Sequence, residues 1–321
     1  MKLVTFETKD GSQLLGWVKN EQFVIDLHSV TEGKVPDNML DFLEHHEEYT
    51  EHLHSLKTFP TSSIYPLSEI KLLAPLPNPK SFRDFYAFEE HVKNARKRRG
   101  LEMIPEWYEL PVFYFSNHQA ITGPEVEIQF PKESLLWDYE LEIACIIGKE
   151  GRDIKADEAD DYIFGLTILN DWSARDLQKK EMKVGLGPAK GKDFATSIGP
   201  YIVTKDELAP FKEKNRYHLE MTAKVNGKLL SSGDAKDMYY TFGQLIEHAS
   251  RDVTLKRGDI IGSGTVGTGC ILELGTDQHR WLKSGDVVEL SITGLGTLKN
   301  IVKGGNEKSD AILSSNGETT A

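Results

Sequence analysis

The sequence predicts a mostly β protein of the α+β class, with mixed but largely antiparallel sheets. Short apolar runs of strand type follow one another between Gly-Asp and Asn-Gly turns. Few segments show helical periodicity, and helices do not alternate regularly with strands as a doubly wound parallel sheet requires. The 321 residues are enough for one large domain and a small companion.

Residues 1–71 predict a small, β-rich N-terminal domain that includes one helix. Strand-like runs open the chain at residues 2–8, 13–19 and 22–27. A turn at Asp10-Gly11 separates the first two runs, and residues 38–57 have the pattern of a helix. The proline-rich stretch at residues 72–82 then indicates a connection, which places the domain boundary near residue 72.

Residues 72–303 predict the larger, β-dominated domain. Its first element is a helix over residues 85–100 that Gly100 ends. Further helices are expected at residues 156–161, 172–181 and 242–250. Strands are expected at residues 111–117, 126–130, 137–148, 162–171, 199–204, 219–230, 258–264 and 285–302. The small, polar residues 304–321 predict a flexible tail.

Composition excludes several classes of function. With 38 basic and 50 acidic residues the formal net charge is −12, which argues against binding to nucleic acid or to anionic membranes. The only two cysteines, Cys145 and Cys270, predict a reducing compartment without a disulfide framework or a zinc site. The polar start and the lack of an apolar run of about 18 residues lead us to expect a cytoplasmic protein.

The segment "LLWDYELEIACIIG" (135–148) combines an apolar strand with three carboxylates, Asp138, Glu140 and Glu142. Because side chains alternate along a strand, these carboxylates share a face with Ala144. The other face carries Tyr139, Leu141, Ile143, Cys145 and Ile147. Carboxylates two positions apart lie roughly 6 to 7 Å from each other, and when partly buried they raise a pKa or recruit a cation. The alternative interpretation is an edge strand with one face in water.

Two further aspartates, Asp171 and Asp84, are also candidate cation ligands next to apolar or aromatic segments. Asp171 ends the apolar run of "LTILNDWSARDLQ", and Asp84 precedes Tyr86 and His91 in "SFRDFYAFEEHV". Taken singly, each aspartate could also be a helix N-cap. Together with the strand carboxylates they form a set of hard oxygen ligands, which suits Mg²⁺, Mn²⁺ or Ca²⁺ and does not suit structural zinc. The set is Asp84, Glu140, Glu142 and Asp171.

Six ordered segments resemble the fumarylacetoacetate hydrolase family, in its bacterial two-domain form, over about residues 72–303. They are "RDFYAFEEH" (83–91), "LPVFYF" (110–115), "WDYELE" (137–142), "NDWSARDLQ" (170–178), "LGPAKGKDFATSIGP" (186–200) and "GSGTVGTGCILELG" (262–275). The resemblance implies a flattened β-roll of mixed, largely antiparallel sheets, preceded by a small SH3-like β domain. It also implies a homodimer.

The resemblance further implies a role for each matching residue. The cation ligands are Asp84, Glu140, Glu142 and Asp171, with Lys192 and Thr196 completing the surroundings. His91 matches the general base and Glu273 the carboxylate that orients it, with Lys192 and Arg175 as further catalytic residues. The substrate-binding positions are Tyr86, Tyr114 and Gln178. Without the motif, His91 would be interpreted as an exposed helix residue.

These residues predict a divalent-metal-dependent hydrolase that cleaves a C–C bond in a β-diketo acid similar to fumarylacetoacetate or an acylpyruvate. Mg²⁺ is the first choice of cation, with Mn²⁺ and Ca²⁺ as alternatives. The alternative activity on the same scaffold is oxaloacetate decarboxylation, or isomerisation or dehydration of a 2-oxo acid. A non-catalytic metal-binding protein is the other class.

The sequence does not decide which of Arg96, Arg98 and Arg99 contacts a substrate carboxylate. The decoy "GSGTVG" (262–267) lacks the following helix that a dinucleotide site needs.

Overall fold

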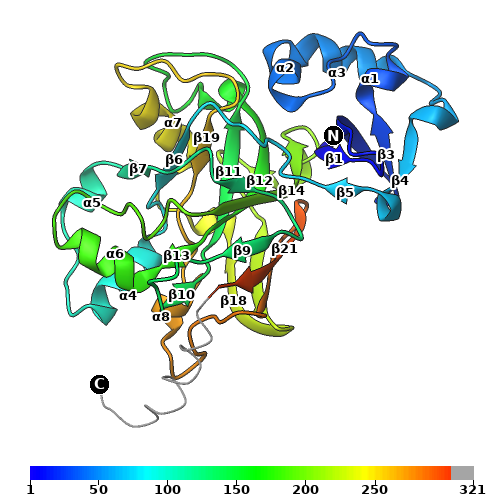
Figure 1. The fold of residues 1–321 in the computed structure, drawn as a ribbon. Helices are drawn as coiled ribbons and strands as arrows, with labels where there is room; N and C mark the ends of the chain where they lie inside the picture. The colour runs from blue at the N-terminus through cyan, green and yellow to red at the C-terminus, as the bar shows by residue number, and fades with distance from the viewer. Residues whose placement is uncertain (305–321) are drawn as a thin grey trace.

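The computed structural model describes residues 1–304 and arranges most of their strands in two large sheets (Figure 1). The tail predicted from residue 304 onward therefore lies, from residue 305, outside the described residues. Strands β6 and β19, β8 and β14, and β9 and β21 pair in parallel, and the other pairs of named strands among residues 1–304 are antiparallel. The predicted mixed and largely antiparallel fold class is confirmed.

The larger sheet has 12 strands in the order β4-β3-β2-β1-β14-β12-β11-β19-β6-β7, with β5 on β1 and β8 on β14. Its strands are β1 (Lys2–Glu7), β2 (Gln13–Lys19), β3 (Phe23–Asp26), β4 (Ile64–Pro66), β5 (Lys71–Leu72), β6 (Phe82–Phe85), β7 (Phe113–Phe115), β8 (Ile121–Thr122), β11 (Leu141–Ile147), β12 (Ile163–Asp171), β14 (Thr196–Thr204) and β19 (Ile260–Gly262). The central strands are buried on both faces, as expected for strands covered on two sides.

The second sheet has five strands in the order β18-β17-β20-β21-β9. They are β9 (Glu127–Gln129), β17 (Glu220–Val225), β18 (Lys228–Asp234), β20 (Val287–Ile292) and β21 (Gly296–Lys303). Two short sheets complete the strands, β10 (Trp137–Asp138) with β13 (Ser173–Ala174), and β15 (Lys212–Glu213) with β16 (Arg216–Tyr217). The main core lies between the two large sheets, where Ile143 and Cys145 of β11 share a cluster with Met221 and Leu290.

Strand β11 confirms the predicted alternation of faces. Its odd-numbered side chains belong to the core between the sheets, whereas Ala144 and Ile146 pack in a second core with Phe42 and Leu43. Glu142 occupies the acidic end of that even-numbered face. The alternative of an edge strand is wrong, because β11 pairs with β12 on one side and β19 on the other and is buried throughout.

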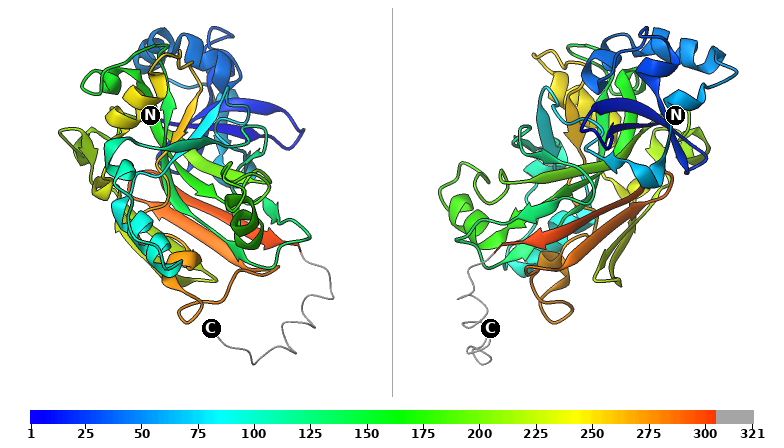
Figure 2. Two further views of the ribbon diagram at one scale, coloured as in Figure 1. Left: turned by 90° about the vertical axis from the view of Figure 1, so that its left-hand side faces the viewer. Right: turned by 45° about the vertical axis from the view of Figure 1, so that its right-hand side comes forward.

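The N-terminal unit is joined to the strands of the larger domain. Residues Lys2 and Leu3 of β1 pair with Val203 and Ile202 of β14, so the first strands extend the same 12-stranded sheet. This unit lies at the opposite end of the molecule from helices α4, α6 and α8 (Figures 1 and 2). The division near residue 72 and the SH3-like arrangement remain predictions.

The helices are short and lie outside the sheets. They are α1 (Leu27–Val30), α2 (Met39–Glu44), α3 (His46–Ser55), α4 (Glu89–Arg98), α5 (Glu106–Glu109), α6 (Arg175–Met182), α7 (Phe242–Ser250) and α8 (Ile271–Leu274). The single helix expected at residues 38–57 is divided at His45, whose backbone leaves the helical region. The helix expected at 156–161 is a 3-10 turn at Ala159–Tyr162. No helix within residues 1–304 combines the length and apolarity needed to cross a bilayer.

Candidate active site

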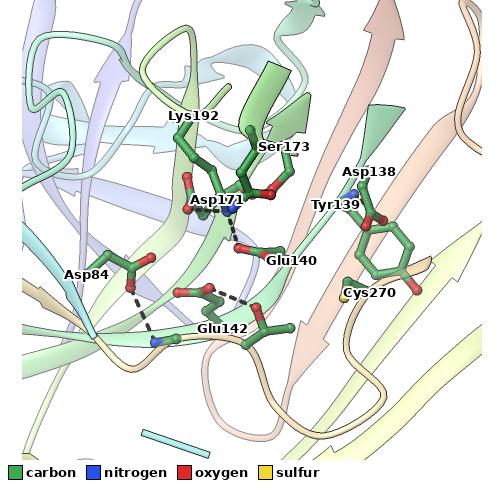
Figure 3. Close-up of polar contacts among 12 residues, drawn as sticks. Asp84, Asp138, Tyr139, Glu140, Glu142, Asp171, Ser173, Lys192 and Cys270 are labelled. Carbon is green, nitrogen blue, oxygen red and sulfur yellow. Dashed lines mark hydrogen bonds and ion pairs between the residues drawn. The ribbon is translucent and has the colours of Figure 1, made fainter. Parts of the chain in front are cut away.

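Three carboxylates from three strands of the larger sheet meet in the buried interior. Asp84 comes from β6, Glu142 from β11 and Asp171 from the end of β12, and one oxygen of each lies within 4.8 Å of the others (Figure 3). Because Asp84 and Asp171 are strand residues and Ala174 precedes α6, the alternative interpretation of these aspartates as helix caps is wrong. These carboxylates, Asp84, Glu142 and Asp171, are called the acidic cluster below.

The acidic cluster has the chemistry of a site for a hard divalent cation. Glu142 Oε2 and Asp171 Oδ1 are buried and have no hydrogen-bond partner. A buried carboxylate oxygen without a partner is costly unless a cation or a proton satisfies it. An all-oxygen donor set suits Mg²⁺, Mn²⁺ or Ca²⁺. The residues present therefore fit the divalent cation that the sequence predicts.

Glu140, the fourth predicted ligand, forms ion pairs with two cationic side chains. It accepts a hydrogen bond from Lys192 Nζ (Figure 3) and another, at 2.8 Å, from Arg175. Burial would raise the pKa of Glu140, but the charges of Lys192 and Arg175 outweigh burial and hold that pKa at about 2. Lys192 also donates to Asp171 Oδ2 at 2.6 Å, so one amine links Glu140 to the acidic cluster.

The acidic cluster is electrostatically strained in the absence of a cation. Burial, together with the charges of neighbouring carboxylates, raises the pKa of Asp84 and that of Glu142 well above the ordinary range. Burial likewise raises the pKa of Asp171, although Lys192 opposes this effect. A bound divalent cation would therefore compete with protons for these oxygens.

His91 and Glu273 form a buried pair between α4 and α8. His91 Nδ1 is hydrogen-bonded to Glu273 Oε1, and the His91 side chain is only 6% exposed. The second oxygen of Glu273 accepts from the backbone N–H of Thr268 at 2.6 Å. The Tyr86 ring stands edge-on to His91, with centroids 5.1 Å apart. In the tautomer whose Nδ1–H donates a hydrogen bond to Glu273, Nε2 carries no proton and can act as a base. The interpretation of His91 as an exposed residue is wrong.

The remaining predicted residues occupy the surroundings of this pair and the acidic cluster. Arg175 NH1 donates to Gln178 Oε1 at 3.0 Å, and the Tyr114 hydroxyl donates to Asp171 Oδ2. Burial raises the pKa of Tyr114 well above its ordinary value, so the phenol stays protonated. Thr196 is buried and faces Asp171 across the β12–β14 ladder. The structure thus gathers the predicted residues around one interior region.

Comparison with known proteins identifies this arrangement. A family model described as "Fumarylacetoacetate (FAA) hydrolase C-terminal" matches residues 80–303. The chain belongs to the fumarylacetoacetate hydrolase family. It is therefore an enzyme of that family, and the resemblance seen in the sequence is confirmed.

Relatives in the family carry different activities in their names. Oxaloacetate tautomerase YisK of Bacillus subtilis (strain 168) is 31% identical over 315 residues, which cover 94% of this chain and 99% of that protein. A fumarylacetoacetase of Arabidopsis thaliana is 32% identical over 290 residues, covering 71% and 68% respectively. The structure of fumarylacetoacetate hydrolase (EaFAH) from psychrophilic Exiguobacterium antarcticum is 26% identical, with a TM-score of 0.72 and coverage of 95% of this chain and 100% of that chain.

Sequence reasoning missed the part that the glycine-rich segment plays in this family member. The backbone N–H of Gly264 donates to Asp84 Oδ1 at 3.3 Å, and Thr265 Oγ1 donates to Glu142 Oε1 at 3.2 Å. A Cβ at Gly262 would lie 2.5 Å from Asp84 Oδ1. Glycine is required because the carboxylate packs against backbone. The closely spaced glycines of "GSGTVG" are the available signal. In the sequence they belong to a family segment and are rejected as a dinucleotide motif, but no contact with Asp84 is assigned to them there.

Asp138 is the second residue whose role the sequence left open. It is buried away from the acidic cluster (Figure 3). Its carboxylate accepts from Arg175 Nε at 2.8 Å and from the backbone N–H groups of Ile271 and Leu272 at 2.8 and 3.1 Å. Because Ile271 and Leu272 begin α8, Asp138 fixes the helix that carries Glu273. This role depends on contacts more than 100 residues away in the chain, which no local pattern reveals.

The structure distinguishes the three arginines at the end of α4. Arg98 donates to the carbonyls of Glu273 and Leu274, at 3.2 and 2.7 Å, and Arg96 donates to the carbonyl of Glu102. Arg99 Nε donates to the carbonyl of Ala95 at 3.0 Å. Its side chain therefore runs back along the helix, on the face that Ala95 shares with His91.

We expect Gly262→Ala to weaken binding of Mg²⁺ or Mn²⁺ by about tenfold or more, since the new methyl group displaces Asp84. Isothermal titration calorimetry on the folded variant measures this affinity. Gly227→Ala is the control, because Gly227 has a positive φ of 78° and no atom near its Cβ position. Gly227→Ala should lose stability and keep its metal affinity. Equal affinities in the two variants would contradict the role given to Gly262.

We also expect the affinity for Mg²⁺ to keep rising with pH above the range in which ordinary carboxyls ionise. The raised pKa values of Asp84 and Glu142 mean that protons occupy the empty cluster at a pH where ordinary carboxyls are ionised. Raising the pH removes these competing protons, and cation binding releases them. Calorimetry in two buffers of different ionisation enthalpy measures the release. An affinity that does not change with pH, with no buffer dependence, would show that the cluster is already ionised.

Proposed function

We propose that this protein is a divalent-metal-dependent hydrolase that cleaves a C–C bond in a β-diketo acid, similar to fumarylacetoacetate or an acylpyruvate. The observation that carries the proposal is the buried His91–Glu273 pair next to the acidic cluster. The two are connected through Asp138 and Arg175, which link the start of α8 to Glu140. A structural metal site needs no such base, which argues against a non-catalytic protein.

The cation in this proposal is Mg²⁺ first, with Mn²⁺ or Ca²⁺ as alternatives, held by Asp84, Glu142 and Asp171 with Glu140 beside them. When bound, such a cation polarises carbonyl oxygens and aligns a chelating oxo-acid. Glu140 and Asp171 also keep the amine of Lys192 charged, since they outweigh burial and raise its pKa. Lys192 can therefore stabilise negative charge that develops on the substrate.

The base in this proposal is His91. Glu273 accepts the Nδ1 proton and so keeps Nε2 free to take a proton from water. The water oxygen then attacks one carbonyl carbon of the diketone, the C–C bond breaks, and the departing carbon receives the electron pair and finally a proton. Burial raises the pKa of Tyr86 to about 12, so its phenol is a hydrogen-bond donor at neutral pH. Tyr86, Tyr114 and Gln178 are the proposed substrate contacts.

Arg99 is the arginine that we assign to a substrate carboxylate. Its side chain runs back along α4 toward His91, and its charge acts on Tyr86 in the direction opposite to burial. Arg96 and Arg98 donate to carbonyls beyond their own helix, those of Glu102, Glu273 and Leu274, whereas the carbonyl that Arg99 contacts belongs to Ala95 of α4. A guanidinium suits carboxylate recognition because it offers paired donors in a plane.

A second candidate is tautomerisation of a 2-oxo acid such as oxaloacetate. The relative that favours it, YisK, is named an oxaloacetate tautomerase and aligns over 94% of this chain. In that reaction His91 would move a proton between carbon and oxygen and would activate no water. The proposal also includes homodimeric assembly, a cytoplasmic location and small oxo-acids as the ligands, without nucleic-acid or membrane partners.

We expect His91→Ala to lower kcat for hydrolysis of a diketo acid by about 10² to 10⁴ and to leave the affinity for Mg²⁺ unchanged. The assay uses acetylpyruvate, fumarylacetoacetate and oxaloacetate, and follows the diketone and enol absorbance, pyruvate and CO₂. Glu273→Gln should lose less activity, because it keeps a side chain beside Nδ1. Enol–keto exchange without any C–C cleavage would establish the tautomerase instead. Activity that survives His91→Ala in every reaction would exclude His91 as the base.

We expect Arg99→Gln to raise KM by about tenfold or more with little change in kcat, since it removes a charge-assisted contact present in both ground and transition states. Steady-state kinetics on the most active of the three oxo-acids measures both constants. Arg96→Gln is the matched control on the same helix, and its KM should stay near that of the parent. The assignment fails when both variants behave alike.

A further inference from the structure

The His91–Glu273 pair, which supplies the base in the proposed mechanism, has a third residue beside it, Cys270. A ring nitrogen of His91, the Cys270 sulfur and a Glu273 oxygen all lie within 4.8 Å of one another. Cys270 Sγ is 3.9 Å from Glu273 Oε1, the oxygen that His91 Nδ1 also contacts. The three side chains are buried, and Cys270 has no exposed surface. We call His91, Cys270 and Glu273 the mixed-donor triad.

The mixed-donor triad differs from the acidic cluster in the kind of cation it suits. Sulfur, imidazole nitrogen and carboxylate oxygen are the donors that Zn²⁺ takes in proteins, with bonds of about 2.3 Å to sulfur and 2.0–2.2 Å to nitrogen and oxygen. Tetrahedral geometry then separates sulfur and oxygen by roughly 3.5 Å, close to the 3.9 Å between Cys270 Sγ and Glu273 Oε1. The His91–Glu273 hydrogen bond must open to roughly 3.3 Å, a movement within side-chain reach.

The elements that carry the triad are held in place. Cys270 is the residue before α8, and Asp138 fixes the first turn of α8 through Ile271 and Leu272. Thr268 N–H holds the other oxygen of Glu273. Ligands held in place by neighbouring hydrogen bonds lose less entropy when a cation binds.

The thiol plays no part in the mechanism proposed above. Burial raises the pKa of Cys270 well above its ordinary value, and the charge of Asp138 adds to this effect. A neutral buried thiol is neither a nucleophile nor a good ligand until a cation displaces its proton. The sequence offered no paired-cysteine motif, so it predicted no zinc site; Cys270 meets His91 only because α4 and α8 are packed together.

We propose that Zn²⁺ binds the mixed-donor triad and inhibits the enzyme by occupying its base. Coordination releases the thiol proton to solvent and moves the single ring proton of His91 from Nδ1 to Nε2, where it blocks the proposed base. The lone pairs of the sulfur, of Nδ1 and of the carboxylate oxygen go to the cation. No oxidation or reduction is involved. The metal site rests on geometry, whereas the inhibition rests on the proposed role of His91.

The first arm of the test is zinc inhibition of the Mg²⁺-loaded enzyme. Each protein is compared with its own zinc-free rate. Cys270→Ala should need at least about tenfold more Zn²⁺ for half-inhibition than the parent, because it lacks one ligand. Cys145→Ala is the matched control, since Cys145 is equally buried but lies in the main core. Equal sensitivity of the parent and Cys270→Ala would overturn the proposal.

The second arm is spectroscopic and does not depend on activity. Co²⁺ added to the Mg²⁺-loaded parent should give a near-ultraviolet thiolate-to-cobalt band, which Cys145→Ala keeps and Cys270→Ala lacks. Cys270→Ser serves in the same way where Cys270→Ala does not fold. Absence of the band in the parent would overturn the proposal. A band that depends on Cys270 without any inhibition would uphold the metal site and count against His91 as the base.

Discussion

Mutual repulsion among buried carboxylates is the constraint on which the rest of this structure depends. Asp84, Glu142 and Asp171 are brought within reach of one another by strands that are covered on both faces, so their charges cannot be hydrated. Lys192 offsets part of the charge, and two carboxylate oxygens keep no partner. The site therefore has unsatisfied oxygens that a cation can bind. Burying these carboxylates lowers the stability of the fold, and the extensive apolar core around them offsets this loss.

The cationic side chains connect the two halves of the active site. Arg175 contacts Glu140 on the metal side and Asp138 on the other, and Asp138 in turn fixes the start of α8. Glu273 belongs to that helix and positions His91. A buried ion pair of this kind contributes little net stability, but it determines where His91, the proposed base, lies relative to the acidic cluster. Burying these charges therefore fixes the relative positions of His91 and the acidic cluster.

The sequence could predict elements and ligand types where the signal is local. The alternation along β11 gave the faces correctly, and the carboxylates at Asp84 and Asp171 were found because each sits in a recognisable motif. The sequence could not predict that the helix breaks at His45 or that β10 ends before Glu140. Both features depend on contacts with residues far away in the chain. The role of the glycines near Asp84 was missed for the same reason, since only a packed neighbour reveals a forbidden Cβ.

By itself the sequence determined the family and the β-dominated fold, and it pointed to a set of hard oxygen donors, because periodicity and donor chemistry are properties of residues in order. Tertiary structure alone decided how those groups are used. It divided the carboxylates between the acidic cluster and the ion pairs of Glu140, turned Arg99 back along α4 toward His91, and placed Cys270 beside His91. These distinctions depend on distances of a few ångströms between segments far apart in the chain, and such distances exist only after the sheets and helices have packed.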